Sequence, residues 1–238
     1  MATARIAALA AGLAFAVASG AAAQRADDAP PPKPTVEKQK LIYADFEKVE
    51  NGKPVSARGG AVTISGYQES DLQPTTIKGA PDGSNTPELV RIKPADPNHL
   101  AKFEFAFKAP NQWAGASLEV KGQADADGRT PPDDVTGFSK ITFQLYATGA
   151  ETVRVEAISR GHGVDLPAGY PQRIFNVRPG LNTYEVALKA LAQPPWVEIK
   201  QDSRKILQKL TAVSITAYCD GCHPTEGMLI VDNVTFEK

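Results

Sequence analysis

Cys219, Cys222 and His223, near the carboxyl end, are the residues whose types and spacing point most directly to chemistry. The spacing C-x-x-C-H is the attachment signature of a c-type haem. The same two thiols stand close enough along the chain to form a disulfide. A ring of four residues contributes only about 2 kcal/mol, so such a disulfide would fix a turn rather than hold a domain together.

A c-type haem needs more than this motif. The histidine of the motif would be one axial ligand, and a second Met or His would be required. Met228 follows within an expected strand, and His99 and His162 lie in expected loops. The helical framework of small cytochromes c is also missing. The sequence therefore favours a Cys219–Cys222 disulfide and no required cofactor, with haem c, metal binding or free thiols as the alternatives.

Polar side chains alternate with apolar ones on two neighbouring segments, and they form a second candidate site: Gln144, Tyr146, Arg154 and Glu156. If the two segments form a hairpin around residue 149, these side chains lie on one face. Charged hydrogen-bonding groups beside an aromatic ring suit the hydroxyls and flat C–H faces of a sugar. The sequence predicts a ligand-binding patch here; the alternative is an ordinary solvated sheet face.

Aromatic residues in expected loops are further candidates for ligand contact. Trp113 and Tyr170 could each stack on a sugar ring, and Trp196 is a third aromatic residue of this kind. The alternative for each is a plug at the edge of the core.

Catalytic and nucleic-acid-binding signatures are missing from the sequence. No H-E-x-x-H, G-x-S-x-G or phosphate-binding Gly-rich motif occurs. Carboxylates are plentiful, but nothing in the sequence pairs two of them for glycoside hydrolysis. The net charge of −1 gives no basic excess for binding nucleic acid. We expect a protein that is not an enzyme and has no nucleic-acid partner.

The segments that must position these residues show the period-two alternation of half-buried antiparallel strands. The clearest are 102–108, 138–149, 151–159 and 211–218, and shorter strands are expected near 41–46, 61–65, 88–92, 115–120, 172–177, 182–188 and 227–237. The best helix pattern is at 202–210, with Asp202 or Ser203 as its cap. One short helix among many strands predicts an all-β, two-sheet antiparallel β-sandwich with jelly-roll connections.

The amino end predicts export. Residues 1–23 combine Arg5, a short apolar run and small residues before Gln24, which is typical of a secretory signal peptide. Residues 24–40 are rich in proline and charge and are expected to be a disordered linker. The β-sandwich domain is expected at 41–238. We therefore expect a periplasmic or secreted protein with no transmembrane segment after cleavage of the signal peptide.

Four segments follow one another in a recognisable order: LIYADFE, LNTYEVALKAL, QDSRKILQKLTAVSITA and GMLIVDNVTFE, at 41–47, 181–191, 201–217 and 227–237. This order resembles family 11 carbohydrate-binding modules and the related domain of complex I intermediate-associated proteins, both galactose-binding-like jelly rolls. It implies a non-catalytic domain whose partner is a polysaccharide or another glycan. The alternative that it implies is a scaffold that assembles envelope proteins.

The same resemblance implies a structural calcium ion where the first and last strands lie together. In this sequence the ion would recruit Asp45, Glu47 and Asp232. Calcium prefers several oxygen ligands, which carboxylates and backbone carbonyls supply. The alternative is that these are strand-end polar groups satisfied by backbone hydrogen bonds.

Overall fold

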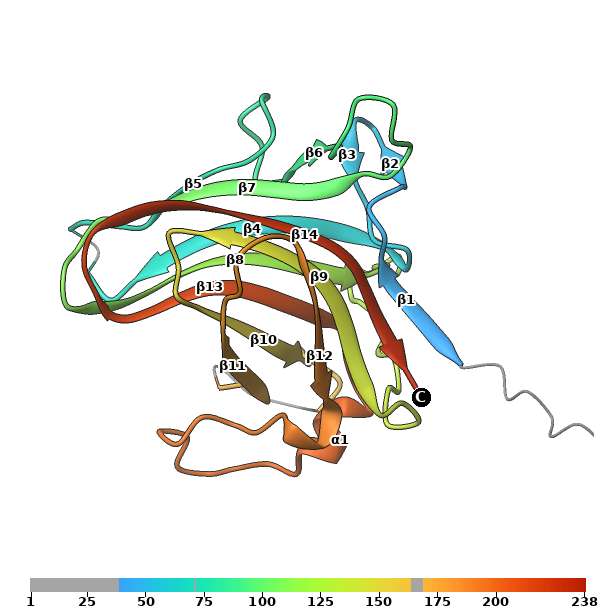
Figure 1. The fold of residues 1–238 in the computed structure, drawn as a ribbon. Coiled ribbons are helices and arrows are strands. Elements are labelled where there is room, and N and C mark those ends of the chain that lie inside the picture. The colour runs from blue at the N-terminus through green and yellow to red at the C-terminus, as the bar shows by residue number, and fades with distance from the viewer. Residues whose placement is uncertain (1–38, 71, 164–168) are drawn as a thin grey trace, which may run out of the picture. The chain divides into compact units, whose positions relative to one another are not determined.

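The protein is described by a computed structural model that covers residues 39–70, 72–163 and 169–238, apart from the side chain of Cys222. The predicted signal peptide and most of the predicted linker lie outside these residues. The described residues form two antiparallel sheets and a small two-stranded ribbon (Figure 1). The predicted all-β sandwich is therefore confirmed.

The first sheet is centred on the last strand of the chain, and we call it the β14 sheet. Its order is β12-β9-β14-β7-β5, with β1 paired to β14 and β6 paired to β7. Its strands are β1 Lys40–Ala44, β5 Thr76–Lys78, β6 Glu88–Val90, β7 Leu100–Phe107, β9 Lys140–Thr148, β12 Asn182–Ala187 and β14 Thr225–Glu237.

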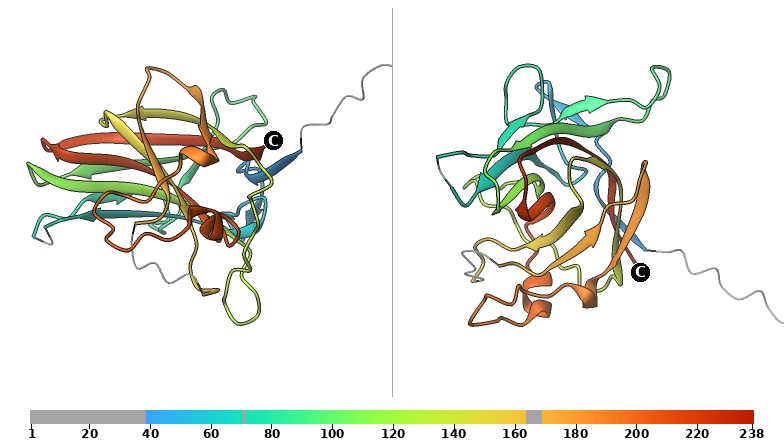
Figure 2. Two further views of the ribbon diagram at one scale, coloured as in Figure 1. Left: turned by 90° about the horizontal axis from the view of Figure 1, so that it is seen from below. Right: turned by 60° about the vertical axis from the view of Figure 1, so that its left-hand side comes forward.

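The second sheet is centred on β13, and we call it the β13 sheet. Its order is β11-β10-β13-β8-β4. Its strands are β4 Gly59–Gln68, β8 Gln112–Gly122, β10 Thr152–Ile158, β11 Gln172–Asn176 and β13 Ala212–Cys222; the small ribbon pairs β2 Val49–Glu50 with β3 Lys53–Pro54. Figure 2 shows the two sheets stacked on each other.

The core lies between the two sheets and is built from the apolar half of each alternating strand. On β7, Phe103, Phe105 and Phe107 are buried while Lys102 and Glu104 are partly exposed, as the sequence predicts. The β13 sheet contributes its own inward rows to the same cluster, among them Leu118, Val153, Val155, Val213 and Ile215. Each large side chain buried in this way contributes about 1.5–3 kcal/mol.

The predicted helix is present and is shorter than expected. The α-helix α1 spans Ser203–Leu207, and a 3₁₀ turn, η1, spans Leu188–Ala190. Asp202 is the N-cap, since its Oδ1 accepts a hydrogen bond from the backbone N–H of Arg204 at 2.9 Å. Ile206 is fully buried against Tyr170, so α1 anchors the connection that leads into β13.

The predicted hairpin around residue 149 is wrong. The strands on either side of it, β9 and β10, belong to different sheets. Their connection crosses the end of the sandwich, and Gly149 takes a φ of 68° there. An added Cβ at Gly149 would stand 2.2 Å from the carbonyl oxygen of Glu226, so the turn needs glycine. The apolar side chains of both strands point into the core. Their alternation along the sequence is the same whether the two strands form a hairpin in one sheet or lie in opposite sheets.

The stability of the sandwich should be most sensitive at its aromatic centre. Phe143 is fully buried, and its ring lies 5.8 Å from those of Phe175 and Tyr184. We predict that Phe143→Ala lowers the free energy of unfolding by about 3–5 kcal/mol, because it leaves a cavity that rigid strands cannot close. Urea denaturation measures this, with Leu72→Ala as the control, since Leu72 is 93% exposed. Similar losses in both variants would contradict the described core.

Candidate functional site

The outward side of the β13 sheet carries a dense set of polar and aromatic side chains, which we call the β13 face. On β10, Val153 and Val155 are buried in the core, so Arg154 and Glu156 point outward. Directly opposite residues of antiparallel strands share a side. Three rows therefore cross β4, β8, β13 and β10 in turn: Tyr67, Gly115, Tyr218 and Thr152; Ser65, Ser117, Thr216 and Arg154; Thr63, Glu119, Ser214 and Glu156.

Arg154 lies between two tyrosine rings at the centre of the β13 face. Its Cζ is 4.9 Å from the ring centroid of Tyr218 and 5.8 Å from that of Tyr67, which are cation–π distances. Its Nη2 also donates a hydrogen bond to the Tyr67 hydroxyl. The two rings thus fix the guanidinium group in one orientation. Trp113 extends the aromatic surface, with its ring 5.5 Å from that of Tyr67 and 43% of the residue exposed.

Gly115 makes this arrangement possible. An added Cβ at this position would stand 2.1 Å from Cζ of Tyr67. The absence of a side chain at Gly115 therefore lets the Tyr67 ring lie across β8 and reach toward β10. Any larger residue there would displace the ring from Arg154.

The charges on the β13 face are shielded from solvent and paired. Glu156 Oε2 lies 3.1 Å from Arg154 Nη2, and the two side chains are only 13% and 15% exposed. Burial raises the pKa of Glu156 above its ordinary value, although the Arg154 charge acts against this rise. Burial also raises the pKa of Tyr67 to about 12, so its hydroxyl stays protonated. Arg154 Nε is buried and has no hydrogen-bond partner among the described residues.

Hydroxyl groups lie beside this ion pair on the middle strands. The Oγ1 atom of Thr216 is 2.7 Å from Ser117 Oγ and 3.1 Å from Ser214 Oγ. All three residues are buried. The centre of the β13 face is therefore a preorganised polar layer, in which aromatic rings, a guanidinium group and hydroxyls adjoin one another.

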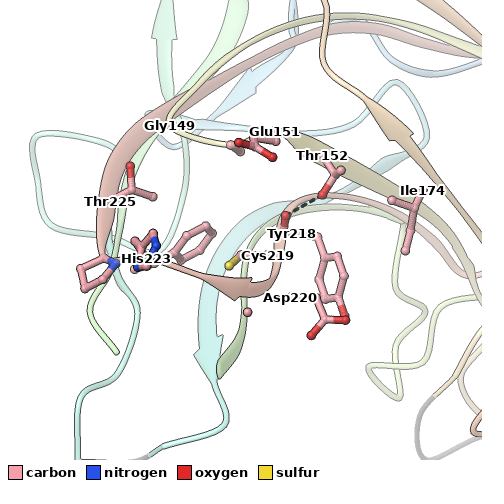
Figure 3. A pocket seen from close by; sticks show the side chains of 13 residues that line it. Gly149, Glu151, Thr152, Ile174, Tyr218, Cys219, Asp220, His223 and Thr225 are labelled. Atoms are coloured by element: carbon pink, nitrogen blue, oxygen red, sulfur yellow. Dashed lines mark hydrogen bonds between the residues drawn. The ribbon is translucent and has the colours of Figure 1, made fainter. Parts of the chain in front are cut away.

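A hollow opens at each end of the β13 face. The first, of about 850 Å³, is bordered by Thr152, Ile174 and Tyr218 and by the connections after β9 and β13 (Figure 3). Thr152 Oγ1 donates to the carbonyl oxygen of Tyr218 at 2.8 Å and closes its inner side. The second hollow, of about 590 Å³, is bordered by Lys121 and Arg160. The face thus forms a continuous surface with a depression at either end.

The structure brings together four of the six predicted ligand-binding residues. Arg154 and Glu156 form an ion pair on β10, and the Trp113 ring packs on that of Tyr67. The Tyr170 hydroxyl interacts electrostatically with Arg160 and Glu156. The other two, Gln144 and Tyr146, lie on β9 in the β14 sheet. The predicted single patch of Gln144, Tyr146, Arg154 and Glu156 is therefore wrong, because the hairpin that would unite them does not form.

Several residues of the site were not predicted from the sequence, among them Tyr67, Glu119 and Arg160. Glu119 accepts hydrogen bonds from both terminal nitrogens of Arg160, at 2.6 and 2.8 Å. The alternation that runs through Thr63 and Ser65 continues to Tyr67, so extending the expected strand 61–65 by two residues would have placed Tyr67 on this face. Nothing in the sequence indicates the Glu119–Arg160 pair, since these residues are 41 positions apart.

The C-x-x-C-H motif spans the end of β13 and the connection to β14, as expected for a β-connection. Cys219 is buried and borders the first hollow together with His223. The side chain of Cys222 is not among those described, so the predicted disulfide stays a prediction. Among the described residues that border this hollow, His223 is the only His, and no Met is present.

The residues of the predicted calcium site lie near one another at the β1–β14 contact. Asp232 is fully buried, and its carboxylate accepts hydrogen bonds from the Asn98 side chain and from Asn233. Glu47 accepts from the backbone N–H and the ring of His99. Within residues 39–70, 72–163 and 169–238, no group of three or more His, Cys, Asp or Glu side chains is arranged to hold a metal ion. The hydrogen bonds satisfy these carboxylates, and calcium binding remains a prediction.

Comparison with known proteins identifies the architecture. No family model matches the chain, and no curated protein matches its sequence. A family 11 carbohydrate-binding module from Clostridium thermocellum, solved with a β-1,3-1,4-mixed-linked tetrasaccharide, is similar at a TM-score of 0.50 and 14% identity. The match covers 83% of this chain and 94% of that one. The fold is a β-sandwich jelly roll similar to that of this module.

A second solved structure of the same family belongs to a cellulosomal cellulase of C. thermocellum. It has a TM-score of 0.49 at 13% identity and again covers 83% of this chain and 94% of that one. Identities this low establish the fold and no more. In the described part of the chain, no helix is both long and apolar enough to cross a membrane.

The carboxyl group of Asp232 should titrate far from its ordinary range. Burial, followed by the charges of Glu47 and Asp45, raises its pKa from 3.8 to about 6. We predict that carbon-detected NMR titration finds this value and that Asp45→Asn lowers it by removing a like charge. Asp220→Asn, at the end of β13, serves as the control. A value near 4 in the unmodified protein would contradict the described environment.

This titration also gives the direction of a pH effect on stability. Because the folded-state pKa lies above 3.8, protonated Asp232 favours folding at low pH, and this contribution is lost as pH rises through about 6. Calcium binding would compete with protons for the carboxylate. If the predicted calcium site exists, adding Ca²⁺ lowers the pKa of Asp232 and raises the melting temperature, and EDTA reverses both changes. No response to millimolar Ca²⁺ would contradict the calcium prediction.

Proposed function

We propose that this chain is an exported, non-catalytic carbohydrate-binding protein that holds a glycan on the β13 face. One observation carries the proposal: the Arg154 guanidinium is held between the rings of Tyr67 and Tyr218 on the outward side of the β13 sheet. The similarity of the fold to modules that bind oligosaccharides supports it. The proposal that the protein is exported rests on the predicted signal peptide at residues 1–23.

The chemistry of the β13 face suits a sugar better than an apolar ligand. A pyranose ring presents flat C–H patches to aromatic rings and hydroxyls to charged or amide groups. The exposed part of Trp113 and the ring of Tyr218 supply the aromatic surface, while Arg154 and Glu156 supply a donor and an acceptor side by side. Because these groups are already oriented by their mutual contacts, little entropy is lost when they bind a ligand.

The two carboxylates of the face support binding without hydrolysis. Glycoside hydrolases use one carboxyl group as an acid and a second as a base or nucleophile. Glu119 has both oxygens bonded to Arg160, and Glu156 is paired with Arg154. We therefore expect no release of reducing ends from any polysaccharide that the protein binds. Envelope-protein assembly and c-type haem attachment remain alternative predictions that no described contact favours.

The location of the site can be tested by comparing two tyrosines on opposite sheets. We predict that Tyr218→Ala weakens binding of a glycan about tenfold, because it removes a stacking ring and frees Arg154 to move. Tyr146→Ala, on β9 of the β14 sheet, should leave the affinity unchanged. Isothermal titration calorimetry against a panel of neutral and acidic polysaccharide fragments measures both effects.

The two variants also give results that would contradict the proposal. A loss confined to Tyr146→Ala would move the site to the β14 sheet. No measurable heat with any member of a broad panel would contradict glycan binding altogether. Circular dichroism and melting curves of both variants check that neither substitution unfolds the sandwich.

A further inference from the structure

The second hollow of the β13 face has a basic lining. Its charged and titratable residues are Lys121, Arg129, Arg160 and His162, and no Asp or Glu is among the described residues that border it. Glu119, which bonds Arg160, lies on the β13 face itself. We call this depression the basic hollow.

The ion pairs at the rim of the basic hollow involve Lys121 and Arg160 but not Arg129. Glu119 bonds Arg160 at 2.6 and 2.8 Å, and its Oε1 lies 3.4 Å from Lys121 Nζ. One carboxylate thus serves two cations. Arg129 is exposed, and its side chain forms no ion pair with any described residue. Three permanently charged cations therefore line the hollow, and none of the described residues that line it is a carboxylate.

The loops that form the basic hollow are bonded to each other. His162 Nε2 lies 2.7 Å from the carbonyl oxygen of Thr130, and Lys209 Nζ donates to the carbonyl oxygen of His162. Asp125 Oδ1 accepts hydrogen bonds from the backbone N–H groups of Asp127 and Arg129, and these bonds hold the turn together. Neither acid of this turn borders the hollow. Arg129 is therefore presented from a fixed turn.

The basic hollow is continuous with the proposed sugar surface. Lys121 follows Glu119 by two residues on β8, so both side chains lie on the same side of the sheet. From Gly115, beneath the Tyr67 ring, to Lys121 the strand advances about 20 Å. A polysaccharide that lies along β8 and β13 would have one part against Tyr67 and Tyr218 and another part above the basic hollow.

We propose that the basic hollow receives an acidic group of the bound glycan, so that the ligand of this protein is an anionic polysaccharide. This inference rests on the proposed function. The acidic group is a carboxylate of a uronic acid or a sulfate ester. Both accept paired hydrogen bonds from arginine and are attracted by the lysine. A neutral glucan would leave Arg129, which pairs with no described carboxylate, without a charged partner in the complex.

The first experiment compares ligands by calorimetry at low and moderate salt. The ligands are an oligogalacturonate, a sulfated galactan oligosaccharide, its desulfated form and a neutral mixed-linkage β-glucan oligosaccharide. We expect one of the two acidic ligands to bind at least tenfold more tightly than the neutral ones, with an affinity that falls as salt is added. Oligogalacturonate binding identifies a carboxylate, and loss of binding on desulfation identifies a sulfate ester.

The second experiment removes the charge of the basic hollow. The variant Lys121→Gln/Arg129→Gln should weaken binding of the acidic ligand about tenfold, since each exposed ion pair is worth a few-fold in affinity. Arg129→Lys, which keeps the charge, should retain most of the affinity. Lys78→Gln is the matched control, because Lys78 is an exposed lysine on β5 of the other sheet.

Each result decides between this inference and the function on which it rests. Equal affinity for acidic and neutral glycans, or no loss in the double variant, overturns the inference and leaves sugar binding intact. An equal loss in Lys78→Gln shows attraction by the net charge alone and also overturns it. If no glycan binds at all, the proposed function fails and this inference fails with it. Melting curves confirm that the variants are folded.

Discussion

The alternation of side chains along each strand is the constraint on which the rest of this structure depends. Successive side chains of a strand point to opposite sides of the sheet. When one side chain is buried in the core, the next one along the strand therefore faces the other side. Val153 and Val155 fix the outward direction of Arg154 and Glu156 in this way. A shift of one residue in the pairing of β10 with β13 would bury an ion pair in the core and expose two valines. Core packing and site geometry are therefore set by the same register.

The polar layer on the β13 sheet is largely shielded from water. Charges that are largely removed from water are costly unless they are paired and hydrogen-bonded. Arg154 meets this requirement with Glu156, the Tyr67 hydroxyl and two ring faces. The result is a rigid surface, which is what recognition of a weakly binding, hydroxyl-rich polymer requires.

Much of the fold follows from the sequence because it depends on local patterns. The alternating strands, the helix near Asp202 and the polar side of β10 were all predicted from the spacing of neighbouring residues. The pairing of strands was not, because β9 and β10 show the same pattern whether their connection turns within a sheet or crosses the core. Gln144 and Tyr146 were assigned to the site by that mistake. The contributions of Gly115 and of the Glu119–Arg160 pair come from contacts between distant segments, and no short window of sequence contains them.

The position of β14 within its sheet has a consequence for how the chain acquires this fold. The last strand, Thr225–Glu237, lies between β9 and β7 and also pairs with β1, the first strand described. The β14 sheet therefore has no continuous hydrogen-bonded centre until residues 225–237 are present. Folding must wait for contacts between segments far apart in sequence, and chains of this kind fold slowly. Until β14 pairs with β1, β7 and β9, the edges of these three strands remain open.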